Sequence, residues 1–139
     1  MRPRKTILCV DNDEQSLSIR KVLLETRGYR VITTTRGRDA LEIFAKGGID
    51  LLLTDLVMPE LDGHDLIVQI KSLSPATPAV LLSGRVRNYD RESVADVFLS
   101  KGNCDAAALL ERIRILLIRK PGPKRAGVMP AAGVFTSAS

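Results

Sequence analysis

The sequence predicts an α/β domain with a doubly wound parallel sheet, covered by helices on both faces. Short apolar runs recur along the chain, and each is followed by a stretch of helical periodicity, as in repeated β-α-β units. Three of the runs are apolar at successive residues, which is typical of strands buried on both sides. Ligands of such open sheets bind beyond the carboxyl ends of the strands, where the strand order reverses. Functional residues are therefore expected at those strand ends.

Five runs are predicted to be strands. Four of them are mainly apolar and span residues 7–10, 51–54, 79–82 and 97–99. The fifth, residues 31–35, is more polar, which favours a position at the edge of the sheet.

Four of the five expected helices are predicted from apolar residues that recur on one face. The first is expected to end near Gly28, where a glycine can adopt the left-handed closing conformation. Gly47-Gly48, Pro75 and the Pro121-Gly122-Pro123 segment mark the ends of the others. The predicted buried faces are Ile19, Val22 and Leu23; Ala40, Leu41 and Phe44; Leu66, Ile67, Ile70 and Leu73; and Ala106, Leu109, Leu110, Ile113 and Leu117.

Composition favours one domain over residues 1–120, followed by a flexible tail over residues 121–139. The chain has 139 residues, 45% of them hydrophobic, which suits a single core. The net charge of +5 is concentrated at the end: residues 119–139 hold four basic residues and no acid. With 4% aromatic residues as well, nucleic-acid binding is not expected.

The sequence gives no sign of a membrane segment or of extracellular chemistry. No apolar run approaches the ~20 residues that a membrane helix needs, and the first residues lead directly into a strand. Cys9 and Cys104 lack the spacing of a zinc site or a disulfide framework, so both are interpreted as reduced thiols. A cytoplasmic location is therefore expected.

Acidic residues stand at the ends of two predicted strands. Asp11 follows the first strand and Asp55 ends the third. Carboxylates gathered in one crevice repel each other unless a cation is shared, and oxygen ligands of this kind suit Mg²⁺. Helix capping is the alternative, and it is the favoured interpretation for Asp13 and Glu14.

A hydroxyl and an ammonium group follow the other two strands. Ser83 comes directly after the fourth strand and Lys101 after the fifth. Taken singly, these would be a turn residue and a solvated surface charge. Together with Asp55 and a cation, they are the groups required for phosphoryl transfer to an aspartate.

The sequence also contains a specific motif, D-x-x-M-P-x-x-D-G, from Asp55 to Gly63. With the Ile-Leu-Cys-Val-Asp string that ends at Asp11 and the Phe-Leu-Ser-Lys string that ends at Lys101, it resembles the receiver domain of two-component response regulators, including chemotaxis receivers. The resemblance covers about residues 4–119. It implies a flavodoxin-like fold with strand order 2-1-3-4-5.

The resemblance also assigns site residues. It implies that Asp55 accepts the phosphoryl group and that Asp11, Asp55 and the main-chain carbonyl of Val57 hold Mg²⁺. It further implies that Lys101 pairs with the phosphate, that Ser83 is the hydroxyl switch and that Phe98 rotates with it. Such a domain is a phosphoacceptor that catalyses only its own phosphorylation and dephosphorylation, and is not a conventional enzyme.

The implied function is a population shift driven by phosphate on Asp55. The phosphoryl donor would be a sensor histidine kinase or a phosphotransfer protein. The output surface would comprise the fourth helix, fifth strand and fifth helix, and would bind an unidentified partner or a second copy of the chain. Since little sequence follows the last helix, a free-standing receiver is expected.

Three positions depart from the family pattern. Asn12 replaces the second acidic residue of the metal pocket, which predicts weaker Mg²⁺ binding, although its amide oxygen and Asp13 nearby could compensate. Gly102 follows Lys101 where the family usually has proline. The interval between Ser83 and Phe98 is short, so the fourth helix, over residues 90–95, is expected to be short or irregular.

The sequence is compatible with two other functions. One is a pseudo-receiver, a protein-binding module of the same fold that is not phosphorylated. The other is a phosphatase of the haloacid-dehalogenase type, because Asp11-Asn12-Asp13 follows an apolar strand. Its expected second acidic pair and substrate-binding cap are not evident. His64 is interpreted as an exposed surface residue.

Overall fold

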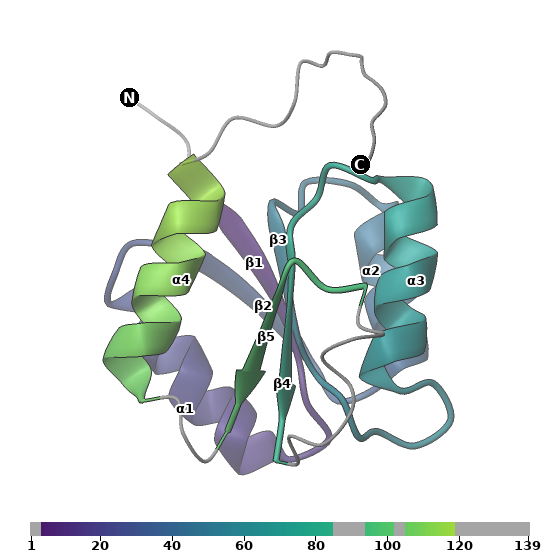
Figure 1. The fold of residues 1–139 in the computed structure, drawn as a ribbon, viewed down its shortest axis with the longest axis horizontal. Helices are drawn as coiled ribbons and strands as arrows, with labels where there is room; N and C mark the ends of the chain where they lie inside the picture. The colour runs from purple at the N-terminus through teal and green to yellow at the C-terminus, as the bar shows by residue number, and fades with distance from the viewer. Residues whose placement is uncertain (1–3, 85–93, 102–104, 119–139) are drawn as a thin grey trace.

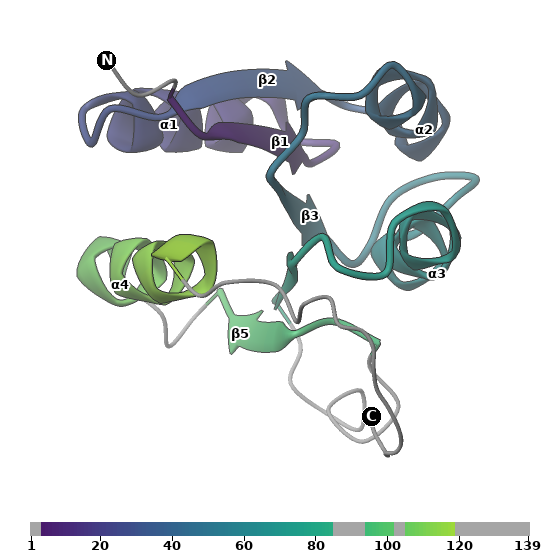
Figure 2. The ribbon, with the colours of Figure 1, turned by 90° about the horizontal axis from the view of Figure 1, so that it is seen from above.

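The computed structural model describes residues 4–84, 94–101 and 105–118 and contains a five-stranded parallel sheet. The sheet order is β2-β1-β3-β4-β5, as predicted. Helices α1 and α4 cover one face, and α2 and α3 cover the other (Figures 1 and 2). The strands are β1 Thr6–Val10, β2 Arg30–Thr34, β3 Leu51–Asp55, β4 Ala79–Ser83 and β5 Val97–Ser100; the helices are α1 Glu14–Glu25, α2 Gly37–Ala45, α3 Gly63–Leu73 and α4 Ala106–Ile118.

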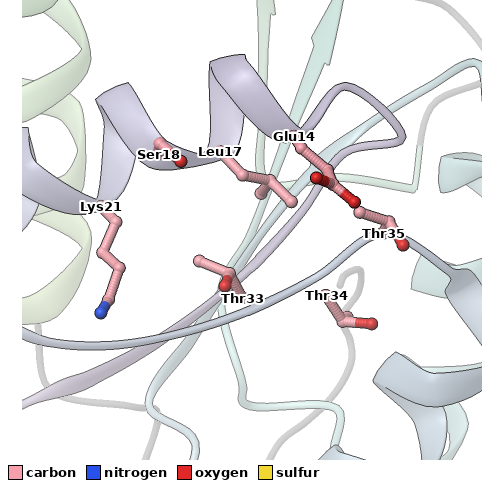
Figure 3. Close-up of a pocket in the computed structure, with 7 residues that line it drawn as sticks. All are labelled: Glu14, Leu17, Ser18, Lys21, Thr33, Thr34 and Thr35. Atoms are coloured by element: carbon pink, nitrogen blue, oxygen red, sulfur yellow. The ribbon is translucent and has the colours of Figure 1, made fainter.

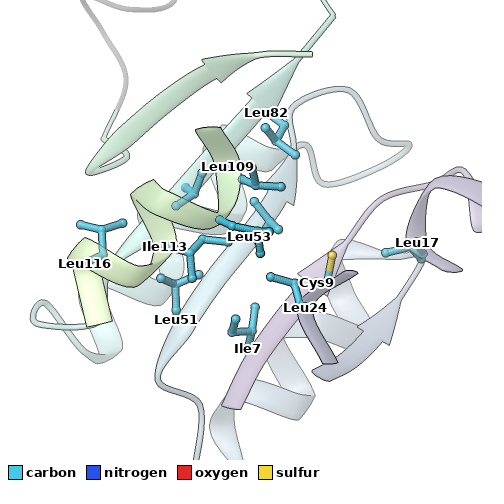
Figure 4. Packing of buried hydrophobic residues seen from close by; sticks show 12 residues of the cluster. Ile7, Cys9, Leu17, Leu24, Leu51, Leu53, Leu82, Leu109, Ile113 and Leu116 are labelled. Carbon is cyan, nitrogen blue, oxygen red and sulfur yellow. The ribbon is translucent and has the colours of Figure 1, made fainter. Parts of the chain in front are cut away.

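Two apolar clusters lie on opposite faces of the sheet, because successive side chains of a strand point to opposite sides. In β1, Ile7 and Cys9 pack with α1 and α4, whereas Leu8 and Val10 pack with α2 and α3. The α1/α4 cluster is shown in Figure 4. Strands β1, β3 and β4 are buried at every residue, so the predicted successive apolar runs are confirmed as central strands.

The edge and turn predictions are also confirmed. Strand β2 pairs only with β1 among the described strands, and its burial alternates between exposed and half-buried residues. Gly28, Gly47 and Gly48 have φ angles of 92°, 89° and 87°, in the left-handed region that glycine adopts without steric cost. These glycines close α1 and α2 as the sequence predicts.

The predicted buried face of α1 is wrong. Ile19 and Val22 are 64% and 62% exposed, while Leu17 and Leu24 are buried. Of the three predicted residues, only Leu23 packs against the core. The helix begins at Glu14, and its orientation on the sheet is set by Leu17 and Leu24, which lie seven residues apart on one side.

Two other residues are also exposed where burial was predicted. Leu73, at the end of α3, is 60% exposed, and Ala106 is exposed in the first turn of α4. Leu73 is the last residue of α3 and Ala106 is the first residue of α4. The rest of the two predicted faces packs inward, with Leu116 as an additional buried residue of α4.

Several predictions concern residues outside the described ranges. They include the start of the short helix over residues 90–95, the conformation of Gly102, the state of Cys104 and the tail at residues 121–139. Ala95 is described, and it lies in a bend rather than a helix. Within the described residues, no helix has both the length and the apolar character required to cross a bilayer.

Candidate functional site

Three side chains from separate strand ends meet at the carboxyl edge of the sheet. The ammonium nitrogen of Lys101, after β5, lies 3.0 Å from Oδ1 of Asp55 and 3.2 Å from Oδ2 of Asp11. Asp55 ends β3, and Asp11 follows β1, the strand next to it. The predicted convergence of these residues is therefore present in the structure, at the place where the strand order reverses.

Both carboxyl groups are shielded from solvent. Asp11 is fully buried, and the side chain of Asp55 is 8% exposed. Burial raises the pKa of Asp55 above its ordinary value of 3.8. The hydrogen bond from Lys101 opposes this shift, and the negative charge of Asp11 adds to it. A cation close to Asp11 and Asp55 therefore lowers the free-energy cost of keeping both carboxyl groups ionised.

The raised pKa of Asp55 predicts a pH-dependent stability difference. Just above pH 3.8 the folded chain retains a proton that the unfolded chain has lost, so deprotonation of Asp55 with rising pH lowers the free energy of unfolding. In EDTA, Asp55→Asn should therefore become more stable relative to wild type as the pH rises from 3.8 through the raised pKa. Urea unfolding of both proteins across acidic and neutral pH measures this difference. A difference that stays constant with pH would contradict the assignment.

Asp13 caps α1, the use that the sequence favoured for it. Its side chain accepts hydrogen bonds from the Gln15 N–H at 3.2 Å and the Ser16 hydroxyl at 2.7 Å. These bonds, led by the one from Ser16, lower the pKa of the exposed Asp13 carboxyl. The Asp13 N–H in turn donates to Oδ1 of Asp11 at 2.9 Å. The start of α1 thus holds Asp11 in place.

The remaining predicted metal ligands lie next to the buried carboxylates in the chain. Asn12 follows Asp11 and is exposed, and Val57 follows Leu56 in the loop after β3 with a 63% exposed side chain. Carboxylate, amide and main-chain carbonyl oxygens are suitable ligands for Mg²⁺. The two buried carboxylates repel each other, so this group of oxygen ligands favours a bound cation. Coordination by Asn12, Asp13 and Val57 stays a prediction.

The loop between β3 and α3 is held against the sheet. The N–H of Leu56 donates to the carbonyl of Leu82 at 2.8 Å, and the N–H of Gly63 donates to the carbonyl of Leu56 at 2.8 Å. Leu56 and Met58 are buried, so the apolar residues of this motif anchor the loop beside Asp55. Glu60 has a positive φ of 71°, which marks the turn at the loop tip.

Ser83 and Phe98 lie on neighbouring strands near the site. Ser83 is fully buried at the end of β4, and its carbonyl accepts a 2.8 Å hydrogen bond from the N–H of Lys101. Phe98 is half-buried and packs against the α2/α3 cluster. The register pairs Leu81 with Phe98 and Ser83 with Ser100. Side-chain alternation therefore places Ser83 and Phe98 on the same face, one diagonal step apart.

One charged residue of the site was missed by the sequence analysis. Nη1 of Arg20, in α1, lies 3.0 Å from Oδ2 of Asp11, and its side chain is only 13% exposed. Arg20 lies between Leu17 and Leu24 on the buried side of α1. The i, i+3, i+7 spacing of these three residues is the signal that could have identified it.

The described ranges also contain a hollow and a group of titratable side chains formed by other residues. A hollow of about 370 Å³ between α1 and the β2 edge is shown in Figure 3; it is lined by Glu14, Leu17, Ser18, Lys21, Thr33, Thr34 and Thr35.

His64 is half-buried and forms a group with Asp62 and Asp65, in which its Nδ1 lies 3.6 Å from Oδ1 of Asp65. It is therefore less exposed and less isolated than predicted. Asp62 also caps α3 by accepting a hydrogen bond from the Asp65 N–H.

Comparisons with solved structures agree with this fold. A CheY-like receiver domain protein from Methanospirillum hungatei has a TM-score of 0.77 and 26% identity, covering 83% of this chain and 94% of that one. The response regulator TrrA from Thermotoga maritima, solved in complex with Mg²⁺-BeF, has a TM-score of 0.74 and 28% identity, covering 81% and 99%.

Sequence comparisons lead to the same family. The sensor kinase/phosphatase LuxN of Vibrio campbellii is 38% identical over 112 residues, which are 81% of this chain and 13% of that protein. The response regulator SaeR of Staphylococcus epidermidis is 31% identical over 84 residues, 60% of this chain and 36% of that protein. This chain thus spans about a third or less of these relatives. The response regulator receiver domain model matches residues 7–114. The chain belongs to the response regulator receiver domain family of two-component systems.

Proposed function

We propose that the chain accepts a phosphoryl group on the carboxylate of Asp55, with Mg²⁺, and uses it as a reversible signal. The observation that carries this proposal is the position of Lys101. Its ammonium group bridges Asp55 and Asp11 at 3.0 and 3.2 Å, from the ends of three different strands. This arrangement combines a nucleophile, a second carboxylate for a metal and a cation for phosphate oxygens.

The proposed reaction is a direct transfer. A carboxylate oxygen of Asp55 attacks phosphorus, a P–O bond to Asp55 forms, and the bond from phosphorus to the donor atom breaks. With a phosphohistidine donor, the bond that breaks is P–N, and the leaving imidazole keeps the electron pair and takes a proton from solvent. Lys101 neutralises charge that develops on the phosphoryl oxygens.

The metal site would be formed by Asp55, Asp11 and residues next to them in the chain. Asp11 and Asp55 would hold Mg²⁺, with oxygens from Asn12 and the Val57 carbonyl as further ligands. When bound, Mg²⁺ supplies positive charge to the phosphoryl group. Because Asn12 is neutral, the metal ligands carry one negative charge fewer than they would with an aspartate at this position. We therefore expect the affinity for Mg²⁺ to be modest. Mg²⁺ affinity that rises little on Asn12→Asp would contradict this part.

The signal would pass through Ser83 and Phe98. A hydroxyl directly beyond the register partner of Asp55 can donate to a phosphoryl oxygen when its loop moves inward. Phe98 lies on the same face of the next strand, so it can follow into the space that Ser83 leaves. The changed surface would include β5 and the last helix, α4, and would bind an output partner.

The proposed donor is a sensor histidine kinase or a phosphotransfer protein. A sensor kinase/phosphatase is among the relatives with matching sequence, which supports a place in a phosphoryl relay. The alternative with the same fold is a pseudo-receiver that binds partners without phosphorylation. A phosphatase that uses Asp11 and Asp13 is disfavoured, because the Asp13 side chain is engaged in the α1 cap.

Incubation with Mg²⁺ and acetyl phosphate tests the proposed function. Intact-mass measurement should show one phosphoryl adduct on the wild type, none on Asp55→Asn, and none on the wild type in EDTA. Asp62→Asn is a suitable control, because Asp62 belongs to the same motif, its side chain caps α3, and asparagine can also cap a helix. It should keep the adduct. No adduct on any protein would favour the pseudo-receiver.

A further inference from the structure

The core-facing side of α1 carries a charged residue. Leu17 and Leu24 are 5% and 0% exposed, and Arg20 lies between them with a side chain that is 13% exposed. A guanidinium group in this position has lost most of its hydration, which is unfavourable without an acidic partner. Asp11, at 3.0 Å, is that partner. The arginine is therefore part of the site rather than of the solvated helix surface.

Arg20 and Lys101 both bind the same oxygen atom of Asp11. Oδ2 of Asp11 accepts from Arg20 at 3.0 Å and from Lys101 at 3.2 Å, while Oδ1 accepts the Asp13 N–H at 2.9 Å. Both oxygens of Asp11 are thus occupied by donors from the protein. Burial raises the pKa of the Cys9 thiol to about 11, although the positive charge of Arg20 opposes this shift, so the thiol stays neutral.

The four side chains joined by these ion pairs balance in charge without a metal. Asp11 and Asp55 supply two negative charges, and Lys101 and Arg20 supply two positive charges. Asn12 adds none. A divalent cation near Asp11 would have to approach the guanidinium and displace a donor from a shared oxygen. Like charges a few ångströms apart in a shielded site repel strongly, because little water lies between them.

We propose that Arg20 is a built-in counter-cation of Asp11 that competes with Mg²⁺ and sets the metal affinity of this receiver. The inference rests on the proposed function, because it assumes that Mg²⁺ binds at Asp11. In the metal-free chain Arg20 compensates the buried carboxylate. In the loaded chain its guanidinium gives up Oδ2 of Asp11 and turns toward solvent.

Replacing Arg20 with methionine tests the inference, because methionine keeps the length and apolar packing of the arginine stem and removes its charge. Calorimetric titration should show Mg²⁺ binding about tenfold tighter to Arg20→Met than to wild type. The rise in Tm on adding Mg²⁺ should also be larger for the variant. A purely structural role would shift Tm equally with and without Mg²⁺ and leave the Mg²⁺ Kd unchanged.

Lys21→Met is the matched control. Lys21 is the next residue of α1, forms an ion pair with Glu25 at 3.5 Å and has a 45% exposed side chain. The Lys21→Met variant therefore loses the same charge as Arg20→Met, but outside the site. Its Mg²⁺ Kd should change by less than about twofold, because solvent screens an exposed charge. Arg20→Lys keeps the charge on the same side of the helix. Its Kd should stay near the wild-type value, and this variant guards against misfolding of Arg20→Met.

Failure of this inference can be separated from failure of the proposed function. A Kd for Arg20→Met that equals the wild-type Kd overturns the role of Arg20, including the case in which neither protein binds Mg²⁺. A tighter Kd in Arg20→Met alone supports it. Formation of the phosphoryl adduct on wild type, but not on Asp55→Asn, reports on the proposed function independently.

Discussion

Gly63→Ala should destabilise the fold by about 3 kcal/mol or more, and lower Tm by roughly 10 °C. A Cβ at Gly63 would overlap the main-chain carbonyl oxygen of Asp55 and would lie 2.9 Å from Cδ1 of Leu81. The carbonyl belongs to the end of a buried strand and cannot move aside as a side chain can. Gly63 is therefore required for α3 to begin directly against the strand that carries Asp55, the proposed phosphoacceptor. Thermal and urea unfolding measure the loss.

Gly84→Ala is the control for this prediction. A Cβ at Gly84 would meet no atom within 4 Å, and the residue is exposed, so its free energy of unfolding should change by less than about 0.5 kcal/mol. Equal stability of Gly63→Ala and wild type would show that the close approach of α3 to Asp55 is absent. The same variant should shift the Asp55 carbonyl, so phosphoryl acceptance should fall along with stability.

Lys101→Met should slow phosphoryl transfer to Asp55 by about 100-fold or more. Lys101 is the cation that faces both carboxylates, and methionine provides neither charge nor hydrogen-bond donor. The loss concerns charge that develops on the phosphoryl oxygens, so it should appear in the rate at saturating donor. Time-resolved intact-mass measurement with acetyl phosphate and Mg²⁺ gives this rate.

Lys46→Met provides the comparison. Lys46 is an exposed lysine at the carboxyl end of α2, the helix that connects the end of β2 to the start of β3. It should keep the wild-type rate within about twofold, since an exposed distant charge is screened. A Lys101→Met rate close to that of Lys46→Met would mean that Lys101 contributes only to holding the two aspartates in the unphosphorylated chain.

The strands could be predicted because the pattern of apolar residues along the chain indicates which strands are buried. Leu51, Leu52 and Leu53 are all fully buried, and such successive apolar residues suit only a strand covered on both faces. The site followed from the same logic, because Asp11 and Asp55 come at the ends of two adjacent strands of this kind. Parallel strands bring their carboxyl ends to one edge, so chain order alone fixes where these side chains meet.

The orientation of α1 could not be predicted from apolar spacing. Ile19, Val22 and Leu23 form a helical stripe as regular as the true one, and Arg20 on the true stripe is a residue that normally marks the solvent side. Arg20 can lie on the buried side with Leu17 and Leu24 because its charge is paired with Asp11, a contact that apolar periodicity does not report. The same omission concealed Arg20 as a member of the site.

The identity of the phosphorylated residue is the most direct test of the account. After reaction with acetyl phosphate and Mg²⁺, borohydride reduces an aspartyl phosphate to homoserine, which remains after digestion. Trypsin places Asp55 in the peptide 47–71, and Asp11 and Asp13 in the peptide 6–20. Homoserine is expected at Asp55 alone. Homoserine in peptide 6–20, or in neither peptide, would contradict the account.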